Sequence, residues 1–142
     1  MGDRGNICIL DDYKPLEHDP VFLYTHWGGS VLKQTLAAAL ARCERGEDGP
    51  YLARIIFCQM VGPDAWDGET GFGISTQICD NEYPVLVVQS GREPMVYECE
   101  CRWEEKERTE GWPKIPRRTD EGHIIFDNRW TFEDFIKKFG PI

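Results

Sequence analysis

The chain has 142 residues, of which 16 are basic and 25 acidic, so its formal net charge is −9 at pH 7. This length matches one domain that can bury a core without disulfide staples. The negative charge repels phosphate backbones, which argues against binding of extended nucleic acid through a broad surface. The negative charge is instead consistent with simple solubility or with attraction of a basic protein partner.

The first residues lack a basic stretch followed by a long apolar core, and no run approaches about 18 apolar residues. We therefore expect no signal peptide and no membrane span, and predict a cytoplasmic protein whose six cysteines are free thiols. The pair Cys99 and Cys101 is spaced too closely for an ordinary structural zinc site. No metal or cofactor is predicted.

The first half of the chain predicts two strands followed by two helices. Apolar and β-branched runs favour strands over 7–11 and 21–27. Helical spacing predicts a helix over 30–45, capped by Ser30 and ended by Gly46. A second helix is predicted over 50–61, with Pro50 at its first position. That helix is apolar on nearly all sides, so we expect it to be buried or to form the interface of a homo-oligomer.

The second half predicts a meander of strands and a closing helix. Strands are expected over 72–78, 83–89 and 95–103, the last with Glu98 and Glu100 on a solvated face. Residues 104–121 are interpreted as a mobile arm or insertion, and 122–126 as a short strand. Thr131 caps a last helix that runs to Phe139. The sum is a single α+β domain over 1–142, with a mostly antiparallel sheet and helices on one face.

The junction at 26–30 is the leading candidate site. A strand turns there through glycines into a helix, whose first N–H groups could hold an anion such as a phosphate. The predicted ligand-binding residues at this place are Tyr24, His26, Trp27, Gly28, Gly29 and Ser30. The alternative is a tight structural turn in which Ser30 acts only as an ordinary helix cap.

A second glycine-rich segment, 67–73, could close over the same ligand. Trp66 and Phe72 would offer stacking surfaces for a base or another ring, and Thr70 completes the predicted set of ligand-binding residues. The alternative is a plain turn followed by a strand glycine.

Catalytic patterns are weaker. His26 could form a nucleophilic or hydrolytic arrangement with Asp11, Asp12 or a cysteine, although no signature selects one thiol. The adjacent Asp11 and Asp12 could also bind a divalent ion or act as acid and base, or simply initiate a turn.

Four stretches, GNICILDD, VFLYTHWGGS, YLARIIFCQMV and TGFGIS, resemble a group of small single-domain proteins of prokaryotic genomes and phages. The similar stretches cover roughly residues 5–90. The group has no established activity, so the resemblance implies a compact, standalone intracellular domain and transfers no functional residue.

We therefore expect a non-enzymatic protein that binds a small ligand, an anion or a nucleotide, and that would act on a host factor if it is phage-borne. One alternative is a hydrolase using His26. The other is an acidic protein-interaction module that binds a basic partner through residues 104–121.

Overall fold

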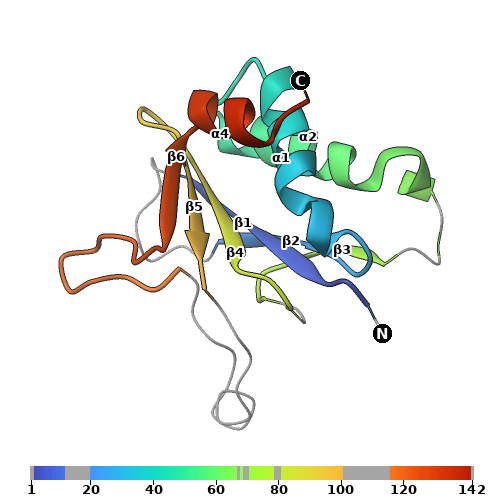
Figure 1. Ribbon diagram of the computed structural model, residues 1–142, viewed down its shortest axis with the longest axis horizontal. Coiled ribbons are helices and arrows are strands. Elements are labelled where there is room, and N and C mark those ends of the chain that lie inside the picture. The colour runs from blue at the N-terminus through green and yellow to red at the C-terminus, as the bar shows by residue number, and fades with distance from the viewer. Residues whose placement is uncertain are drawn as a thin grey trace, which may run out of the picture.

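The computed structural model describes residues 2–11, 20–66, 68, 71–78, 81–100 and 116–141 (Figure 1). Its elements, in chain order, are β1 (Gly5–Asp11), β2 (Val21–Thr25), the 3-10 helix η1 (Gly29–Val31), α1 (Leu32–Arg42), α2 (Gly49–Val61), the 3-10 helix η2 (Gly62–Trp66), β3 (Phe72–Ser75), β4 (Val85–Ser90), β5 (Met95–Cys99), β6 (Asn128–Thr131) and α4 (Phe132–Phe139).

The strands form one sheet in the order β3-β2-β1-β4-β5-β6. Strands β1 and β4 run parallel, with Ile7 opposite Leu86, whereas every other neighbouring pair is antiparallel. The parallel pair is possible because the chain passes through α1 and α2 between these two strands. The predicted α+β class with a mostly antiparallel sheet is confirmed.

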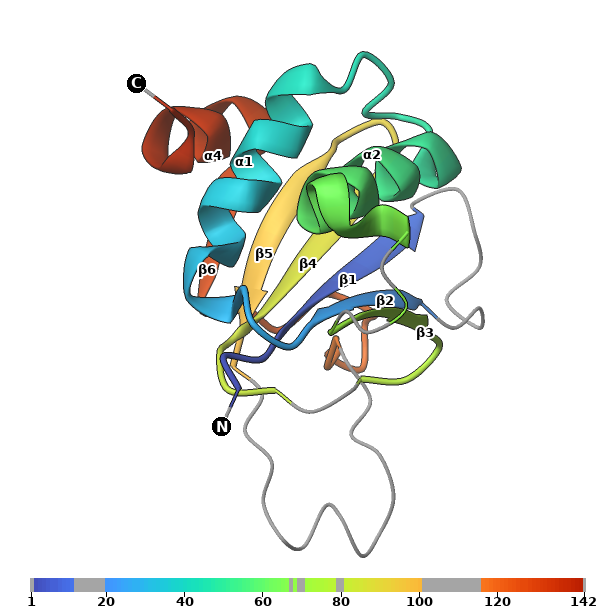
Figure 2. The same cartoon turned by 90° about the vertical axis from the view of Figure 1, so that its right-hand side faces the viewer.

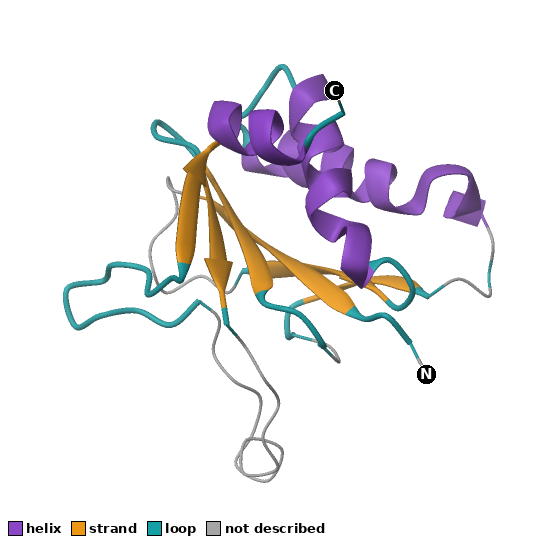
Figure 3. Cartoon of the chain, in the orientation of Figure 1, coloured by secondary structure: helices purple, strands orange, loops and turns teal. Residues whose placement is uncertain are grey.

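The two faces of the sheet bury two different clusters. Alternate residues of the strands point to opposite sides. One set packs with buried residues of all three helices, and its strand members are Ile7, Ile9, Leu23, Leu86, Val88 and Val96. The other set contains no helical residue and consists of Cys8, Phe22, Ile78, Val85, Val87 and Cys99. Figures 2 and 3 show α1, α2 and α4 on the same side of the sheet, as predicted.

The start of α1 differs from the prediction. Ser30 belongs to η1, and α1 begins only at Leu32, with no side-chain cap at Val31. Ser30 lies one residue before the N-cap position of α1, and its hydroxyl donates a hydrogen bond to Asp3. At its other end α1 stops at Arg42, three residues early. By contrast, Thr131 caps α4 as predicted, accepting a hydrogen bond from the Asp134 N–H at 3.1 Å.

Of the two environments expected for α2, complete burial within the chain is wrong, and the subunit interface stays a prediction. Leu52 and Ile56 are fully buried against the core, but Tyr51 and Arg54 on the outer side are exposed. A helix that lies over one face of a sheet at the edge of a helical layer keeps its outer side in solvent.

The region after β5 is described only in part. Residues 101–115 lie outside the described residues, and in the segment 116–127 Arg118 forms a β-bridge with Ile124. Ile124 packs on the second face of the sheet. The interpretation of 104–121 as a mobile arm or insertion stays a prediction. The predicted strand over 122–126 is reduced to that bridge, and the edge strand is β6 instead.

An ion pair between a partly exposed lysine and a buried carboxylate connects α1 to the sheet. The Lys33 Nζ lies 2.5 Å from the Glu98 carboxylate, which also accepts a hydrogen bond from the Asn128 side chain at 2.8 Å. Glu98 is therefore not on a solvated face: it is a buried carboxylate whose cost of burial is offset by two partners.

Two general expectations concern thiols and membranes. Cys8, Cys43, Cys58 and Cys99 are free, whereas Cys79 and Cys101 lie outside the described residues. Among the described helices, none combines the length and the apolar character needed to cross a bilayer.

Candidate functional site

The junction between β2 and α1 is in contact with the residues that precede β1. The Asp3 N–H donates to the His26 carbonyl at 2.7 Å, and the Gly29 N–H donates to the Asp3 carbonyl at the same distance. The segment before β1 thus extends the pairing of β1 with β2 beyond Thr25. Asp3 is a residue of this junction that the pattern at 26–30 did not predict.

The backbone donors at this junction already have acceptors. The Gly28 N–H donates to the Thr25 hydroxyl at 3.1 Å, and the Ser30 N–H donates to the Asp3 carboxylate at 3.0 Å. Together with the Gly29 bond and the bond from Val31 to the Gly28 carbonyl at 3.3 Å, every N–H from 28 to 31 is satisfied within the protein. The prediction of free N–H groups at this turn is therefore wrong.

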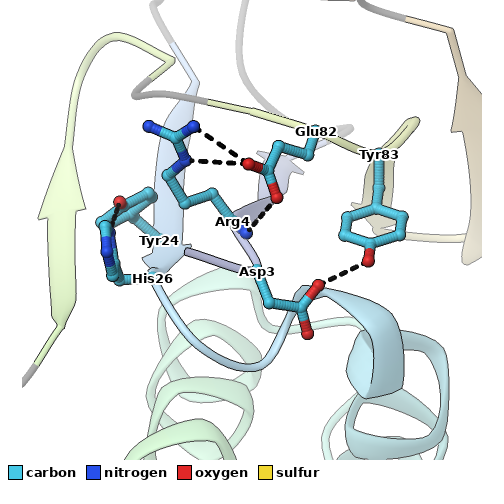
Figure 4. Close-up of polar contacts among 6 residues, drawn as sticks. All are labelled: Asp3, Arg4, Tyr24, His26, Glu82 and Tyr83. Atoms are coloured by element: carbon cyan, nitrogen blue, oxygen red, sulfur yellow. Dashed lines mark hydrogen bonds and ion pairs between the residues drawn. The ribbon is translucent and has the colours of Figure 1, made fainter. Parts of the chain in front are cut away.

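The Asp3 carboxylate takes the place that an external anion was expected to fill. It accepts hydrogen bonds from the Ser30 N–H and from the Ser30 hydroxyl, the latter at 2.6 Å. It also accepts a hydrogen bond from the Tyr83 hydroxyl at 2.5 Å (Figure 4). The hydrogen bonds from Ser30, and then that from Tyr83, hold the pKa of Asp3 below its usual value. The charge also lies at the positive end of α1.

The next residue, Arg4, fixes the same segment to the chain before β4. Its N–H donates to the Glu82 carboxylate at 3.1 Å, and its guanidinium lies 2.9 Å from that carboxylate (Figure 4). The Glu82 N–H returns a hydrogen bond to the Arg4 carbonyl at 3.0 Å. The hydrogen bonds from Arg4 keep the pKa of Glu82 below its usual value. Asp3 and Arg4 therefore join 26–30 to 82–83.

His26 is held in place on several sides. Its Nδ1 shares a hydrogen bond with the Tyr24 hydroxyl at 2.8 Å, and its ring meets that of Trp27 edge-on, with centroids 4.3 Å apart. The His26 N–H donates to the Gly71 carbonyl at 2.7 Å. A Cβ added at Gly2 would lie 2.8 Å from the His26 Nε2, so the backbone before Asp3 also contacts the imidazole.

The aromatic part of the predicted site remains accessible. Trp27 is 63% exposed although its ring is positioned against His26, and Trp66, at the end of η2, is 98% exposed. Phe72 lies half-buried in β3 opposite Thr25. The structure thus brings Tyr24, His26 and Trp27 into contact, while Thr70 lies outside the described residues.

The proposed pairing of His26 with Asp11 is wrong. Thr25, which precedes His26, pairs with Gly5 at one end of β1, whereas Asp11 pairs with Ser90 at the other end. Six residues of strand at about 3.3 Å each place the two side chains roughly 20 Å apart. Asp12 lies outside the described residues.

The Cys8 thiol is not a nucleophile available to His26, because it is buried in the sheet. Complete burial raises the pKa of the Cys8 thiol, which keeps it protonated and unreactive. Within the described ranges, no three His, Cys, Asp or Glu side chains are grouped as metal ligands.

Comparisons with protein-family models, with curated proteins and with solved structures find no match to this chain. The resemblance noted above therefore stays a prediction, and the function must be argued from the residues themselves.

The Asp3–Tyr83 bond should make stability depend on pH at both extremes. The pKa of Asp3 is lower in the folded than in the unfolded protein. The ionised Asp3 carboxylate therefore contributes fully to the free energy of unfolding above the unfolded pKa of about 3.9, and this contribution is lost as pH falls through the folded pKa. The bond to Asp3 raises the pKa of Tyr83, so its contribution is complete below about pH 10 and is lost as pH rises through the folded value.

Tyr83→Phe should therefore be less stable than the wild type at pH 7, and the difference should shrink at both ends of the pH range. Urea unfolding of the wild type and of Tyr83→Phe at closely spaced pH values measures this difference in the free energy of unfolding. A difference that stays constant from pH 2.5 to 11.5 would contradict the assigned bond.

Proposed function

We propose that this protein is a non-enzymatic binding protein for a small molecule with a planar ring, such as a nucleoside or nucleotide. The ligand would stack on Trp27, beside His26 and Tyr24. This proposal keeps Tyr24, His26 and Trp27 of the predicted site, and gives up both the stacking on Trp66 and the anion contact with the backbone of Gly28–Ser30.

A positioned but exposed indole is the observation that carries the proposal. Trp27 is 63% exposed, yet its edge-on contact with His26 and the hydrogen bond between Tyr24 and His26 restrict the arrangement of the rings. A preorganised aromatic surface loses little conformational entropy when a ring stacks on it. Stacking of a base on an aromatic side chain contributes about 1–3 kcal/mol.

The charges around the ring favour recognition of the ring over recognition of a phosphate. The Asp3 carboxylate already occupies the donors of Ser30 and Tyr83, and Glu82 pairs with the Arg4 guanidinium. A phosphate would have to compete with both carboxylates in a chain of net charge −9. We therefore expect a nucleoside to bind at least as well as its monophosphate.

Titration of the ¹⁵N-labelled protein with adenosine, AMP and inorganic phosphate tests the proposal. Adenosine and AMP should shift the Trp27 indole signal with dissociation constants within about threefold of each other, and phosphate should leave the Gly29 and Ser30 amides unshifted. Trp27→Ala should weaken adenosine binding about tenfold, equivalent to about 1.4 kcal/mol.

Trp66→Ala is the matched control, because Trp66 is equally large and more exposed, and no ring contact to His26 positions it. Its loss should change adenosine binding less than threefold. Phosphate shifts at Gly29 and Ser30 would instead support the original anion hypothesis. No response of Trp27 to any of the three probes would reject ring binding at this place.

A further inference from the structure

The two edges of the sheet differ in charge. Strand β6 forms one edge and carries Arg129, whose guanidinium lies 5.4 Å from the centre of the Phe126 ring. Strand β3 forms the other edge, beside β2 (Figure 2), and its four residues, FGIS, include neither a charge nor a proline. Proteins usually protect a free edge with charged side chains or prolines, because its backbone pairs readily with another strand. Strand β3 lacks both protections.

The backbone of β3 has hydrogen-bonding groups on its open side. The His26 N–H donates to the Gly71 carbonyl at 2.7 Å, and the register of β3 with β2 continues regularly from there. In an antiparallel pair, residues that bond to the neighbouring strand alternate with residues that face away from it. Gly71 and Gly73 therefore face β2. Phe72 and Ile74 direct their N–H and carbonyl groups to the open side, where no strand of the described residues pairs with β3.

The side chains at this edge are apolar and accessible. Ile74 lies opposite Leu23, which is buried in the helical core cluster, so the Ile74 side chain lies on the helical side of the sheet. Ile74 is nevertheless 63% exposed. A Cβ at the neighbouring Gly73 would meet nothing within 4 Å, so space is also open on the other side. An added strand would cover apolar surface here as well as backbone groups.

The sequence around β3 is acidic. Residues 55–91 hold no Lys, Arg or His but five acidic residues, at 64, 67, 69, 80 and 82. Of these, Glu82 is paired with Arg4, whereas Asp64 in η2 is exposed. A second copy of the chain would bring two such acidic stretches together, which disfavours pairing of β3 with itself. A segment with basic residues would be attracted instead.

We propose that the open edge of β3 binds an extended basic and apolar peptide segment of a partner protein, which adds a strand to the sheet. Hydrogen bonds to the backbone of Phe72 and Ile74 would fix the register of the peptide, and an apolar side chain would cover Ile74. Lys or Arg at the ends of the segment would match the acidic sequence on both sides of β3. This surface is separate from the ring-binding place at Trp27 and does not depend on it.

Titration of the ¹⁵N-labelled full chain with three synthetic peptides tests the proposal. The probe is acetyl-KTVTVTK-amide, and acetyl-ETVTVTE-amide reverses the charge of its ends. The third peptide has the sequence of the probe but N-methylated central residues, which cannot donate backbone hydrogen bonds. The probe should shift the Phe72 and Ile74 amides and bind at least tenfold more tightly than either control. Its affinity should fall several-fold between 0.05 and 0.5 M NaCl, because salt screens the attraction.

Ile74→Lys should weaken binding of the probe at least tenfold, because it removes the apolar contact and places a positive charge on the edge. Val31→Lys is the matched control. Val31 is also exposed, at 53%, and the substitution changes the net charge equally, but Val31 lies in η1 and outside β3. It should change the affinity less than threefold. Thermal melts of both variants establish that they are folded.

Three results would overturn the proposal. One is the absence of shifts at Phe72 and Ile74 with the probe at 2 mM. Another is equal binding of the probe and either control peptide, because association would then need no backbone pairing or no basic ends. The third is a shift of the same two amides when the chain alone is concentrated from 20 to 500 μM, since the edge would then be covered by a second copy.

Discussion

Gly29→Ala should lower the free energy of unfolding by about 3 kcal/mol. A Cβ at this position would lie 2.7 Å from the Tyr83 ring and 2.8 Å from the Asp3 carbonyl oxygen, distances that folded proteins do not accommodate. Overpacking of this kind costs about 1–3 kcal/mol, and displacement of the Asp3 backbone would also weaken the hydrogen bond from the Gly29 N–H, worth about 1 kcal/mol.

Gly73→Ala provides the matched control, because a Cβ there meets nothing within 4 Å. In a β-strand the added methyl group removes freedom from the unfolded chain, so stability should stay equal or rise by up to about 1 kcal/mol. Urea unfolding of both variants and the wild type makes the comparison. If the two alanines had equal effects, the close packing of the Asp3 segment against Gly29 and Tyr83 would be refuted.

The effects of Gly29→Ala and Tyr83→Phe on the free energy of unfolding should not be additive. In Gly29→Ala the Tyr83 ring must move, so a second change to Tyr83→Phe should cost less than it does in the wild type. Such non-additivity is expected for residues that share partners. Additive effects would indicate that the Tyr83 hydroxyl and the Gly29 contact act independently.

Elements with a local signature were predictable from the sequence. The run Val85–Val88 predicted β4, and the spacing of Thr131 and Asp134 predicted the capped start of α4. Each depends on residues close together in the chain. The packing of helices on one face followed from the short connections and the apolar stripes.

The candidate site was only half predictable, because its two halves depend on different kinds of contact. Tyr24, His26 and Trp27 are close together in sequence, and their side chains contact one another in the structure. The partners of the backbone donors come from elsewhere: Asp3 is 27 residues before Ser30 and 80 before Tyr83. An isolated carboxylate ahead of a strand leaves no periodic pattern, so the sequence indicated an open anion site where the protein supplies its own carboxylate.

Glu98 illustrates the same limit in the core. The alternation of β5 predicted a solvated face, because Glu98, Glu100 and Arg102 alternate with Tyr97, Cys99 and Cys101 and share their face only with Val96. The register with β4 instead turns Glu98 toward the helices, where Lys33 from α1 and Asn128 from β6 satisfy it. Only the three-dimensional pairing of distant segments decides whether a carboxylate in a strand is exposed.

Phe135→Ala should have the largest effect of any change considered, about 4 kcal/mol of lost stability. Phe135 is fully buried and is the only buried residue of α4, where its ring lies 5.4 Å from that of Trp130 and 4.8 Å from that of Phe139. Truncating a buried Phe removes its transfer free energy and leaves a cavity, which together cost about 3–5 kcal/mol. This is a large share of the roughly 5–15 kcal/mol that stabilises a typical domain.

The same substitution at Phe126 is the matched control, because Phe126 is 42% exposed and meets mainly Tyr97 and Arg129. It should cost about 1 kcal/mol, since aromatic contacts at a partly exposed site contribute little beyond the area they bury. Hydrogen exchange should then show α4 opening first in Phe135→Ala, because Phe135 is its single fully buried anchor. Equal losses at the two positions would mean that α4 adds no more to the core than a surface ring does, and that the helical layer is closed by α1 and α2 alone.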